Sequence, residues 1–414
     1  MNPAMISIAA LAGAILVSCL APINVGFLSI ALAFGIGHFL AGMKVSAIMA
    51  GFPSSLFLTL TGITLLFGQS SVNGTLDKLA RRSVRLASGN RGVVPVVFFF
   101  LAVALGASGA GGIAAAALLA PVAMSVAEEM RISPFLMAMM LANGANAGTF
   151  SPIAPTGLIA RDLMTRIGLQ GMEWPNFFNT LAAQSFVAFA GYLLFGGWKL
   201  FRSGPAHRVS ENRIEPFDGA QRLTLAVTGT LILSVVFFNV DVGLGAFVCA
   251  AVISALRAAD EEAAVRSMPW NIILMVCGVT VLIEVLTKTG GMDLFTGMLA
   301  GVSNPRYIAG VMALVTGVIS AYSSSSGVVL PMFLPAVPGL IAKLGGGNAL
   351  MIAYSINVGS HLVDVSPLST VGALCIAGAS SRENRTLLFR KLMAWGWSMA
   401  VVGAVVCQVF FGFR

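Results

Sequence analysis

The chain has 414 residues, of which 57% are hydrophobic and 10% charged, and its mean hydropathy is +0.91. These values exclude a soluble globular protein and place the chain in a lipid bilayer. The net charge of +8 does not indicate a nucleic-acid partner, because membrane proteins concentrate Lys and Arg in cytoplasmic loops. The five cysteines have no C-x-x-C spacing and indicate neither disulfides nor a metal site. We expect no enzyme activity and no organic cofactor.

The N-terminal 76 residues carry one charged side chain, Lys44. They lack the basic n-region of a cleaved signal peptide and predict membrane helices from the start. The next segment, residues 76–86, alternates apolar and basic side chains at helical spacing and predicts an amphipathic helix in the membrane interface. Its counterpart in the second half is residues 292–299.

Two charge-free runs, residues 93–127 and 307–342, are too long for one membrane span and too short for two complete ones. Each has a centre of small and polar residues, at 106–112 and 320–327. This length and centre predict two re-entrant hairpins. A single long helix that uses small residues for packing remains the alternative.

The segments that follow the two hairpins share a helix-breaking motif. At an offset of about 215, Gly144 aligns with Gly359, and Ser151-Pro152 and Gly157 align with identical residues of the second half. The motif predicts broken helices at 133–160 and 349–380. Paired broken helices in two halves of a membrane chain are a sequence signal for a transporter's binding site.

The repeat extends further, since Pro53, Gly62, Thr64, Gly74 and Asp77 recur 216 residues later. We predict an all-α polytopic membrane protein with repeats at 1–198 and 223–414 and a cytoplasmic linker at 199–222. Five complete passes per half invert the second half relative to the first. The full count is about ten transmembrane helices, two hairpins and two broken helices, which is the inverted-repeat architecture of secondary transporters.

Basic residues orient this topology, because 17 of the 24 Lys and Arg side chains fall in segments predicted on one side. By the positive-inside rule this side is the cytoplasm, so both termini lie outside. We expect an integral protein of a bacterial inner membrane.

Four breaks, two hairpin tips and two Ser-Pro segments, would converge if the halves pack about a pseudo-two-fold axis. Each break starts a helix whose N-terminus carries roughly +0.5 charge, which favours a dianion. The same breaks end helices, and their carbonyls favour Na⁺ or a proton. The expected partners are therefore the bilayer, a small anion and a coupling cation.

The candidate substrate contacts are the polar and helix-breaking residues of the four breaks. They are Ser108, Gly109, Asn143, Asn146, Thr149, Ser151, Pro152 and Thr156 in the first half, and Ser323, Ser324, Ser325, Asn357, Ser366, Pro367, Ser369 and Thr370 in the second. For each hydroxyl, a helix cap or an interhelical hydrogen bond is the alternative role.

His361 and Asp364 are an ionisable pair inside the second predicted broken helix. Such groups within a membrane segment indicate ion binding or proton transfer, and a structural pair is the alternative. A Na⁺ ion would lie near Ser108, Asn146, Ser324 and Asp364.

These motifs resemble the MatC-like dicarboxylate (malonate) carriers, relatives of the divalent anion:sodium symporters in the ion transporter superfamily. The resemblance rests on residues 73–77, 121–125, 132–134, 144–148, 151–157, 326–331 and 363–367. It implies transport of malonate or a C4-dicarboxylate with Na⁺ or H⁺ by an elevator motion, in which a mobile domain moves past a homodimeric scaffold.

The chain departs from this pattern at the hairpin tips. The symporters carry Ser-Asn-Thr at both tips, whereas this chain has Ser108-Gly109-Ala110 and Ser323-Ser324-Ser325. The serines carry over, but the Asn and Thr contacts do not, so His361 and Asp364 leave room for proton coupling.

Two other functions fit parts of the sequence. A cation/proton antiporter of the same superfamily would use Asp364 and His361 without an organic anion. An intramembrane serine protease would use Ser108 in a Gly-x-Ser-Gly motif with His361 as its base, although such short matches are common in a glycine-rich chain.

Overall fold

The computed structural model describes residues 3–20, 23–76, 78, 90–202, 216–238, 240–321, 324–379 and 384–412. These residues form helices and connecting segments, with no strand among them. The predicted interfacial helix at 76–86 and the centre of the predicted linker, residues 203–215, lie outside the described residues apart from Leu76 and Lys78.

The helices of the first half are α1 (Pro3–Leu20), α2 (Val25–Phe34), α3 (Val45–Met49), α4 (Ser54–Val72), α6 (Val93–Leu105), α7 (Gly111–Glu129), α8 (Pro134–Gly148), α9 (Pro155–Arg166) and α10 (Glu173–Leu194). Those of the second half are α11 (Gly219–Phe238), α12 (Val242–Ala255), α13 (Glu261–Ser267), α14 (Trp270–Lys288), α15 (Gly291–Gly301), α16 (Ile308–Ser320), α17 (Leu330–Phe333), α18 (Val337–Leu344), α19 (Ala349–Leu362), α20 (Thr370–Ala377) and α21 (Arg385–Phe411).

Six described helical segments are long and apolar enough to cross a bilayer, and a bent pair, Ser325–Phe333 with Val337–Leu344, would make a seventh. Two of the six, Val93–Glu129 and Ala349–Ala377, each join two helices across a break. The protein is therefore a polytopic helical membrane protein. The predicted number of about ten spans is not reached by length alone. The remaining apolar helices, such as Val242–Ala255, are shorter than the roughly 20 residues that span 30 Å of hydrocarbon.

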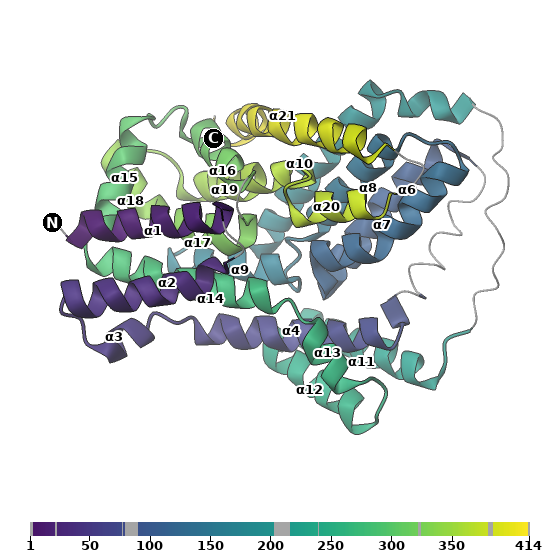
Figure 1. The fold of residues 1–414 in the computed structure, drawn as a ribbon, viewed down its shortest axis with the longest axis horizontal. Coiled ribbons are helices and arrows are strands. Elements are labelled where there is room, and N and C mark those ends of the chain that lie inside the picture. The colour runs from purple at the N-terminus through teal and green to yellow at the C-terminus, as the bar shows by residue number, and fades with distance from the viewer. Residues whose placement is uncertain are drawn as a thin grey trace.

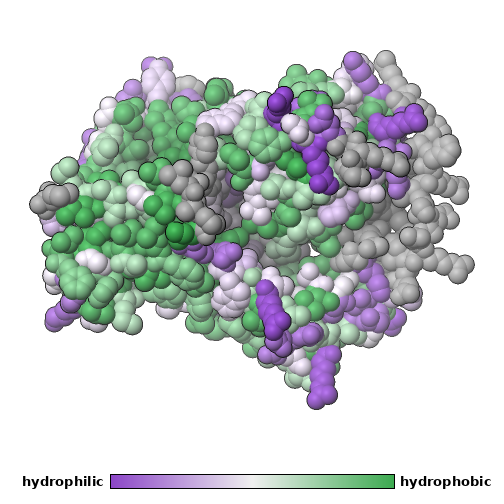
Figure 2. Space-filling model, viewed as in Figure 1, coloured by the Kyte–Doolittle hydropathy of each residue, from purple (hydrophilic) through white to green (hydrophobic). Residues whose placement is uncertain are grey.

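The surface fits this environment. Apolar side chains cover the face over α1 and α2, while hydrophilic ones gather around α13 and one end of α21 (Figure 2). On α2, Phe27, Ile30 and Phe34 are exposed, as expected of side chains that contact lipid.

The first predicted hairpin corresponds to α6, the π-helical turn Gly106–Ala110 and α7. Arg91, just before α6, donates from Nε to the carbonyl of Met130, just after α7, at 2.6 Å. The chain thus enters and leaves this segment at the same end. With 13 residues, α6 is only about 20 Å long, too short to cross the hydrocarbon core.

The second hairpin has the same plan. It comprises α16, the π-helical turn Ser325–Val329, α17 and α18, with a 41° bend before α18. Its ends also meet, since a Cβ placed on Gly346 would lie 3.5 Å from the Cβ of Pro305. Residues 322 and 323, at its tip, lie outside the described residues.

Two long helices, one in each half, pack against helices of the other half. Helix α4 packs on α12, and α14, which begins 216 residues after α4, packs on α2. Glycines allow both contacts, because a Cβ at Gly62 would lie 2.4 Å from the oxygen of Gly243, and one at Gly278 would lie 2.2 Å from that of Gly26. This arrangement is the packing expected of two related halves.

A second body of helices lies beside these pairs. Figure 1 shows α6, α7 and α8 together, with α20 beside α7. They share an apolar core with Val365 and Cys375 of the second half. The first hairpin therefore packs with parts of both broken helices, although these segments come from opposite halves of the sequence.

Candidate functional site

The first broken helix is interrupted at residues 149–154, between α8 and α9. The amide of Ala154 donates to the Ser151 carbonyl at 2.9 Å, and the amide of Gly157 donates to the Thr149 carbonyl at 3.1 Å. Pro155 starts α9, a position where its missing N–H costs nothing. A Cβ at Gly157 would lie 2.0 Å from the Ser151 oxygen, so this turn requires glycine.

The second broken helix has the same design. Helix α19 passes into the 3₁₀ turn Val363–Val365, and α20 begins at Thr370. The hydroxyl of Ser369 accepts from the Gly372 amide at 3.2 Å and donates to the Ser366 carbonyl at 2.9 Å. A Cβ at Gly372 would lie 2.0 Å from the Ser366 oxygen. Each aligned glycine therefore meets the carbonyl of the aligned serine.

Asp364 joins this second break to the tip of the second hairpin. The Ser325 Oγ lies 2.6 and 2.7 Å from the two carboxylate oxygens, and the Ser320 Oγ lies 3.4 Å from Oδ1. The two serine hydroxyls also bond to each other. Among the described residues, no basic side chain forms an ion pair with Asp364. Hydrogen bonds from hydroxyl groups stabilise the carboxylate without neutralising its charge, which leaves it able to bind a cation or a proton.

His361 does not pair with Asp364 in the part of the chain that the structure describes. Its Nδ1 lies 3.1 Å from the Asn357 carbonyl and 2.9 Å from the Ser360 hydroxyl. Its ring packs edge-on against Phe150 of the first break, with centroids 4.5 Å apart. His361 therefore connects the two broken helices.

The first-half candidates lie at the hairpin tip and along α8. Ser108 donates to the Leu105 carbonyl at 2.9 Å. Among the described hydrogen bonds, none joins Ser108 to His361 as a protease dyad would. Asn143 donates to the Met139 carbonyl at 2.8 Å. Two buried atoms, Asn143 Oδ1 and Asn146 Nδ2, have no hydrogen-bond partner and are available to a ligand.

The other first-half candidates surround the break itself. Thr149 and Thr156 bond to each other across it at 3.3 Å. Ser151 is buried and Pro152 half-buried. Gly109 has φ +112° and lies against Phe67 of α4, a conformation that favours glycine.

The second-half candidates divide into two groups. Ser324 caps the return arm of its hairpin by accepting from the Gly327 amide at 3.0 Å, while Ser366, Pro367, Ser369 and Thr370 form the second break. Asn357 lies apart from both, where its side chain bonds to Asn176 on α10 at 2.9 Å. Ser323 lies outside the described residues.

Contacts connect all four breaks in series. At the first hairpin tip, Gly109 approaches the Ile153 carbonyl of the first break. Phe150 of that break contacts His361, and Asp364 contacts Ser325 of the second tip. The four residues proposed to hold Na⁺, Ser108, Asn146, Ser324 and Asp364, do not hydrogen-bond to one another among the described contacts. No group of three His, Cys, Asp or Glu side chains that could hold a metal occurs in the described residues.

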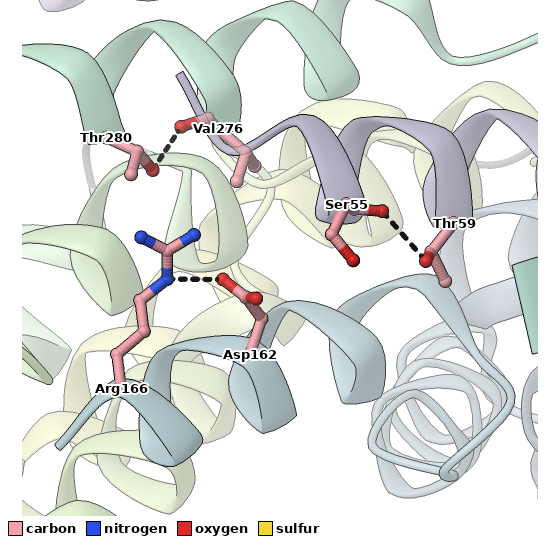
Figure 3. A network of polar contacts seen from close by, with 6 residues as sticks. All are labelled: Ser55, Thr59, Asp162, Arg166, Val276 and Thr280. Carbon is pink, nitrogen blue, oxygen red and sulfur yellow. Dashed lines mark hydrogen bonds and ion pairs between the residues drawn. The ribbon is translucent and has the colours of Figure 1, made fainter. Parts of the chain in front are cut away.

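A charged pair lies on α9 beside α4 and α14. Arg166 donates from Nε to Asp162 Oδ2 at 2.8 Å, and its guanidinium points toward Thr280 of α14 (Figure 3). Ser55 and Thr59 of α4 lie on the other side of the pair. Polar side chains thus line the junction between a broken helix and the two long helices. The sequence analysis did not single out this pair.

Comparisons with known proteins agree with this arrangement. Residues 1–149 match the family described as "Dicarboxylate carrier protein MatC N-terminus". Over these residues the resemblance to MatC-type carriers is confirmed. No curated protein sequence matches the chain.

A solved structure shares the fold over its full length. The chain is similar to the Alcanivorax borkumensis YdaH transporter, whose crystal structure is described as having an unusual topology, with a TM-score of 0.58 and 14% identity. The alignment covers 100% of this chain and 99% of that one. The MatC-type match supports a transporter rather than an enzyme, and the solved structure shows the shared fold.

Proposed function

We propose that this protein is a secondary active transporter that moves a small dicarboxylate, malonate or a C4-dicarboxylate, across the bacterial inner membrane together with Na⁺ or H⁺. One observation carries the proposal. The two broken helices and the two hairpin tips form a single contact series, from Gly109 through Phe150 and His361 to Asp364 and Ser325. Irregular backbone at membrane depth is tolerated only where it is buried in protein or lines a water-filled cavity.

The charge of this region suits a dianion. Helices α9 and α20 both begin at the breaks, and each N-terminus carries roughly +0.5 charge. The unpartnered amide nitrogen of Asn146 adds a hydrogen-bond donor on α8. Backbone amides, hydroxyls and this amide would hold the two carboxylates, while Ser108, Thr149, Ser151 and Thr156 supply further contacts.

Asp364 is the proposed coupling residue. Its carboxylate accepts hydrogen bonds from serine hydroxyls and, among the described residues, has no basic side chain to neutralise its charge. A bound Na⁺ ion or proton would lower the free-energy cost of burying the Asp364 charge. Release of this cation would alter the contact between the second hairpin and the second broken helix. Binding of the cation and closure of the second hairpin tip are therefore coupled in this proposal.

The mobile unit would consist of the hairpins and broken helices, and the scaffold of α2, α4, α12 and α14. The boundary is made of small, mostly apolar contacts, such as Gly109 on Phe67 and Gly327 on Met275. Contacts of this kind can slide more readily than ion pairs, which suits an elevator motion. Dimerisation through the scaffold is part of the proposal by resemblance to the carrier family.

A cation/proton antiporter is the second candidate, because the Asp364 site has no basic partner among the described residues and would bind a cation without any anion. The two functions differ in their response to dicarboxylates. A transporter for dicarboxylates must bind them, whereas an antiporter has no reason to.

The binding test is the thermal unfolding of the purified protein in malonate, succinate, acetate or propionate at equal ionic strength. We expect the two dicarboxylates to raise Tm by a few degrees, since a ligand at 100 times its Kd stabilises the native state by about 2.7 kcal/mol. The monocarboxylates should leave Tm unchanged. Equal Tm values in all four buffers would contradict the dicarboxylate assignment and favour the antiporter.

A further inference from the structure

Helix α10 carries a polar stripe that the transport site does not use. Asn176, Thr180 and Gln184 are spaced four residues apart and are at most 2% exposed. At this spacing they lie on one face of the helix, and that face packs on α19. The stripe therefore forms one side of a buried seam between α10 and α19, close to the second break.

Two hydrogen bonds hold the seam together. Asn357 donates from Nδ2 to Asn176 Oδ1 at 2.9 Å, and Gln184 donates from Nε2 to the His361 carbonyl at 3.0 Å. Both bonds consume amide N–H groups. The side-chain amide oxygens of Asn357 and Gln184 are left without a hydrogen-bond partner.

Three buried oxygens of the seam have no hydrogen-bond partner: Asn357 Oδ1, Thr180 Oγ1 and Gln184 Oε1. Thr180 lies midway between the two bonded positions of α10. Its hydroxyl does not bond to the carbonyl one turn earlier, as that of Thr296 does at 2.9 Å. A buried polar atom without a partner costs about 1–3 kcal/mol, so three along one seam indicate a missing ligand.

The chemistry of these atoms selects the ligand. Two amide oxygens and a hydroxyl are neutral oxygen donors, as Na⁺ prefers, and they include no carboxylate of the kind a divalent cation requires. Helix α19 ends at Leu362, so its C-terminal carbonyls place negative partial charge at the same end. The three atoms without a partner are all oxygens and no basic side chain is among them, so the seam favours a cation over an anion.

We propose that the seam between α10 and α19 is a binding site for a dehydrated monovalent cation of the Na⁺ class, with Thr180, Gln184 and Asn357 as oxygen ligands. The site is separate from the Asp364 carboxylate. This site would add a coupling ion next to His361 to the proposed transport function. Only its role in transport rests on that proposed function. Binding itself is testable without substrate.

The test is a Na⁺ titration of Tm for the purified protein, without dicarboxylate and with choline chloride holding the ionic strength constant. We expect Na⁺ to raise the Tm of the wild-type protein. Thr180→Val, which removes one ligand oxygen at nearly constant volume, should move the Na⁺ midpoint up by on the order of tenfold. Thr180→Ser, which keeps the oxygen, should restore a midpoint near the wild-type value.

Thr296→Val is the matched control, because Thr296 is equally buried on α15 and its hydroxyl is satisfied within its own helix. It should leave the Na⁺ midpoint unchanged. A water molecule could satisfy the same three atoms, in which case Thr180→Val would keep the wild-type Na⁺ midpoint and overturn the proposal. No Na⁺ effect on wild-type Tm would also overturn it. The dicarboxylate-induced Tm shift, measured separately on each variant at one saturating Na⁺ concentration, reports on the proposed dicarboxylate binding.

Discussion

Asp364→Asn is expected to lower dicarboxylate uptake driven by an ion gradient by about 10- to 100-fold, which corresponds to the loss of about 1.5–3 kcal/mol for one hydrogen bond to a charged group. The carboxylate accepts from Ser325 at 2.6 Å and links the second break to the hairpin tip. The substituted amide has one acceptor oxygen and no charge, so it can neither bind a cation strongly nor release a proton. Initial uptake rates into proteoliposomes measure the effect.

Asp293→Asn is the control for this substitution, because Asp293 is exposed on α15. The control removes the same negative charge at a position away from the breaks. Ser325→Ala should give a smaller loss than Asp364→Asn, because Ser320 still reaches the carboxylate. Gradient-driven uptake by Asp364→Asn at the wild-type rate would remove Asp364 from the coupling mechanism.

Gly372→Ala and Gly157→Ala are each expected to abolish most of the uptake and to lower Tm. In either variant the new methyl group would lie 2.0 Å from a backbone carbonyl oxygen, of Ser366 or Ser151. Backbone cannot yield as a flexible side chain does, and overpacking of this kind costs about 1–3 kcal/mol or more. The break would have to open, and the N-terminus of the following helix would move away from the site.

Gly229→Ala is the matched control, because nothing lies within 4 Å of a Cβ placed on this glycine of α11. Alanine there should leave uptake unchanged and be neutral or slightly stabilising, as alanine favours helix. Wild-type Tm and uptake in both break variants would show that the close approach of glycine to carbonyl is not needed for the site.

The breaks were predictable because their causes are local. A Ser-Pro pair removes a helix hydrogen bond wherever it occurs, and the glycine six residues later recurs in both halves. Both segments are interrupted at these residues in the structure. The number of spans was less predictable. Hydrophobicity predicts that a segment lies in the membrane. The length of the helix in that segment also depends on the tertiary contacts at its ends.

The site was only partly predictable because side-chain direction depends on backbone that sequence spacing does not reveal. His361 and Asp364, three residues apart, would share one face of a continuous helix. The helix ends at Leu362 and a 3₁₀ turn follows, so one side chain faces Phe150 and the other Ser325. The polar stripe of α10 was not predicted, because the partners of these side chains depend on the packing of α10 against α19.

The central claim is transport of a dicarboxylate driven by an ion gradient. The most direct measurement is uptake of labelled malonate and of labelled succinate into proteoliposomes that contain the purified protein, under an inward Na⁺ gradient and separately under an inward H⁺ gradient. We predict uptake under at least one gradient, competed by unlabelled dicarboxylates and not by monocarboxylates. Absence of uptake under both gradients, from protein that is folded in the vesicles, would contradict this account.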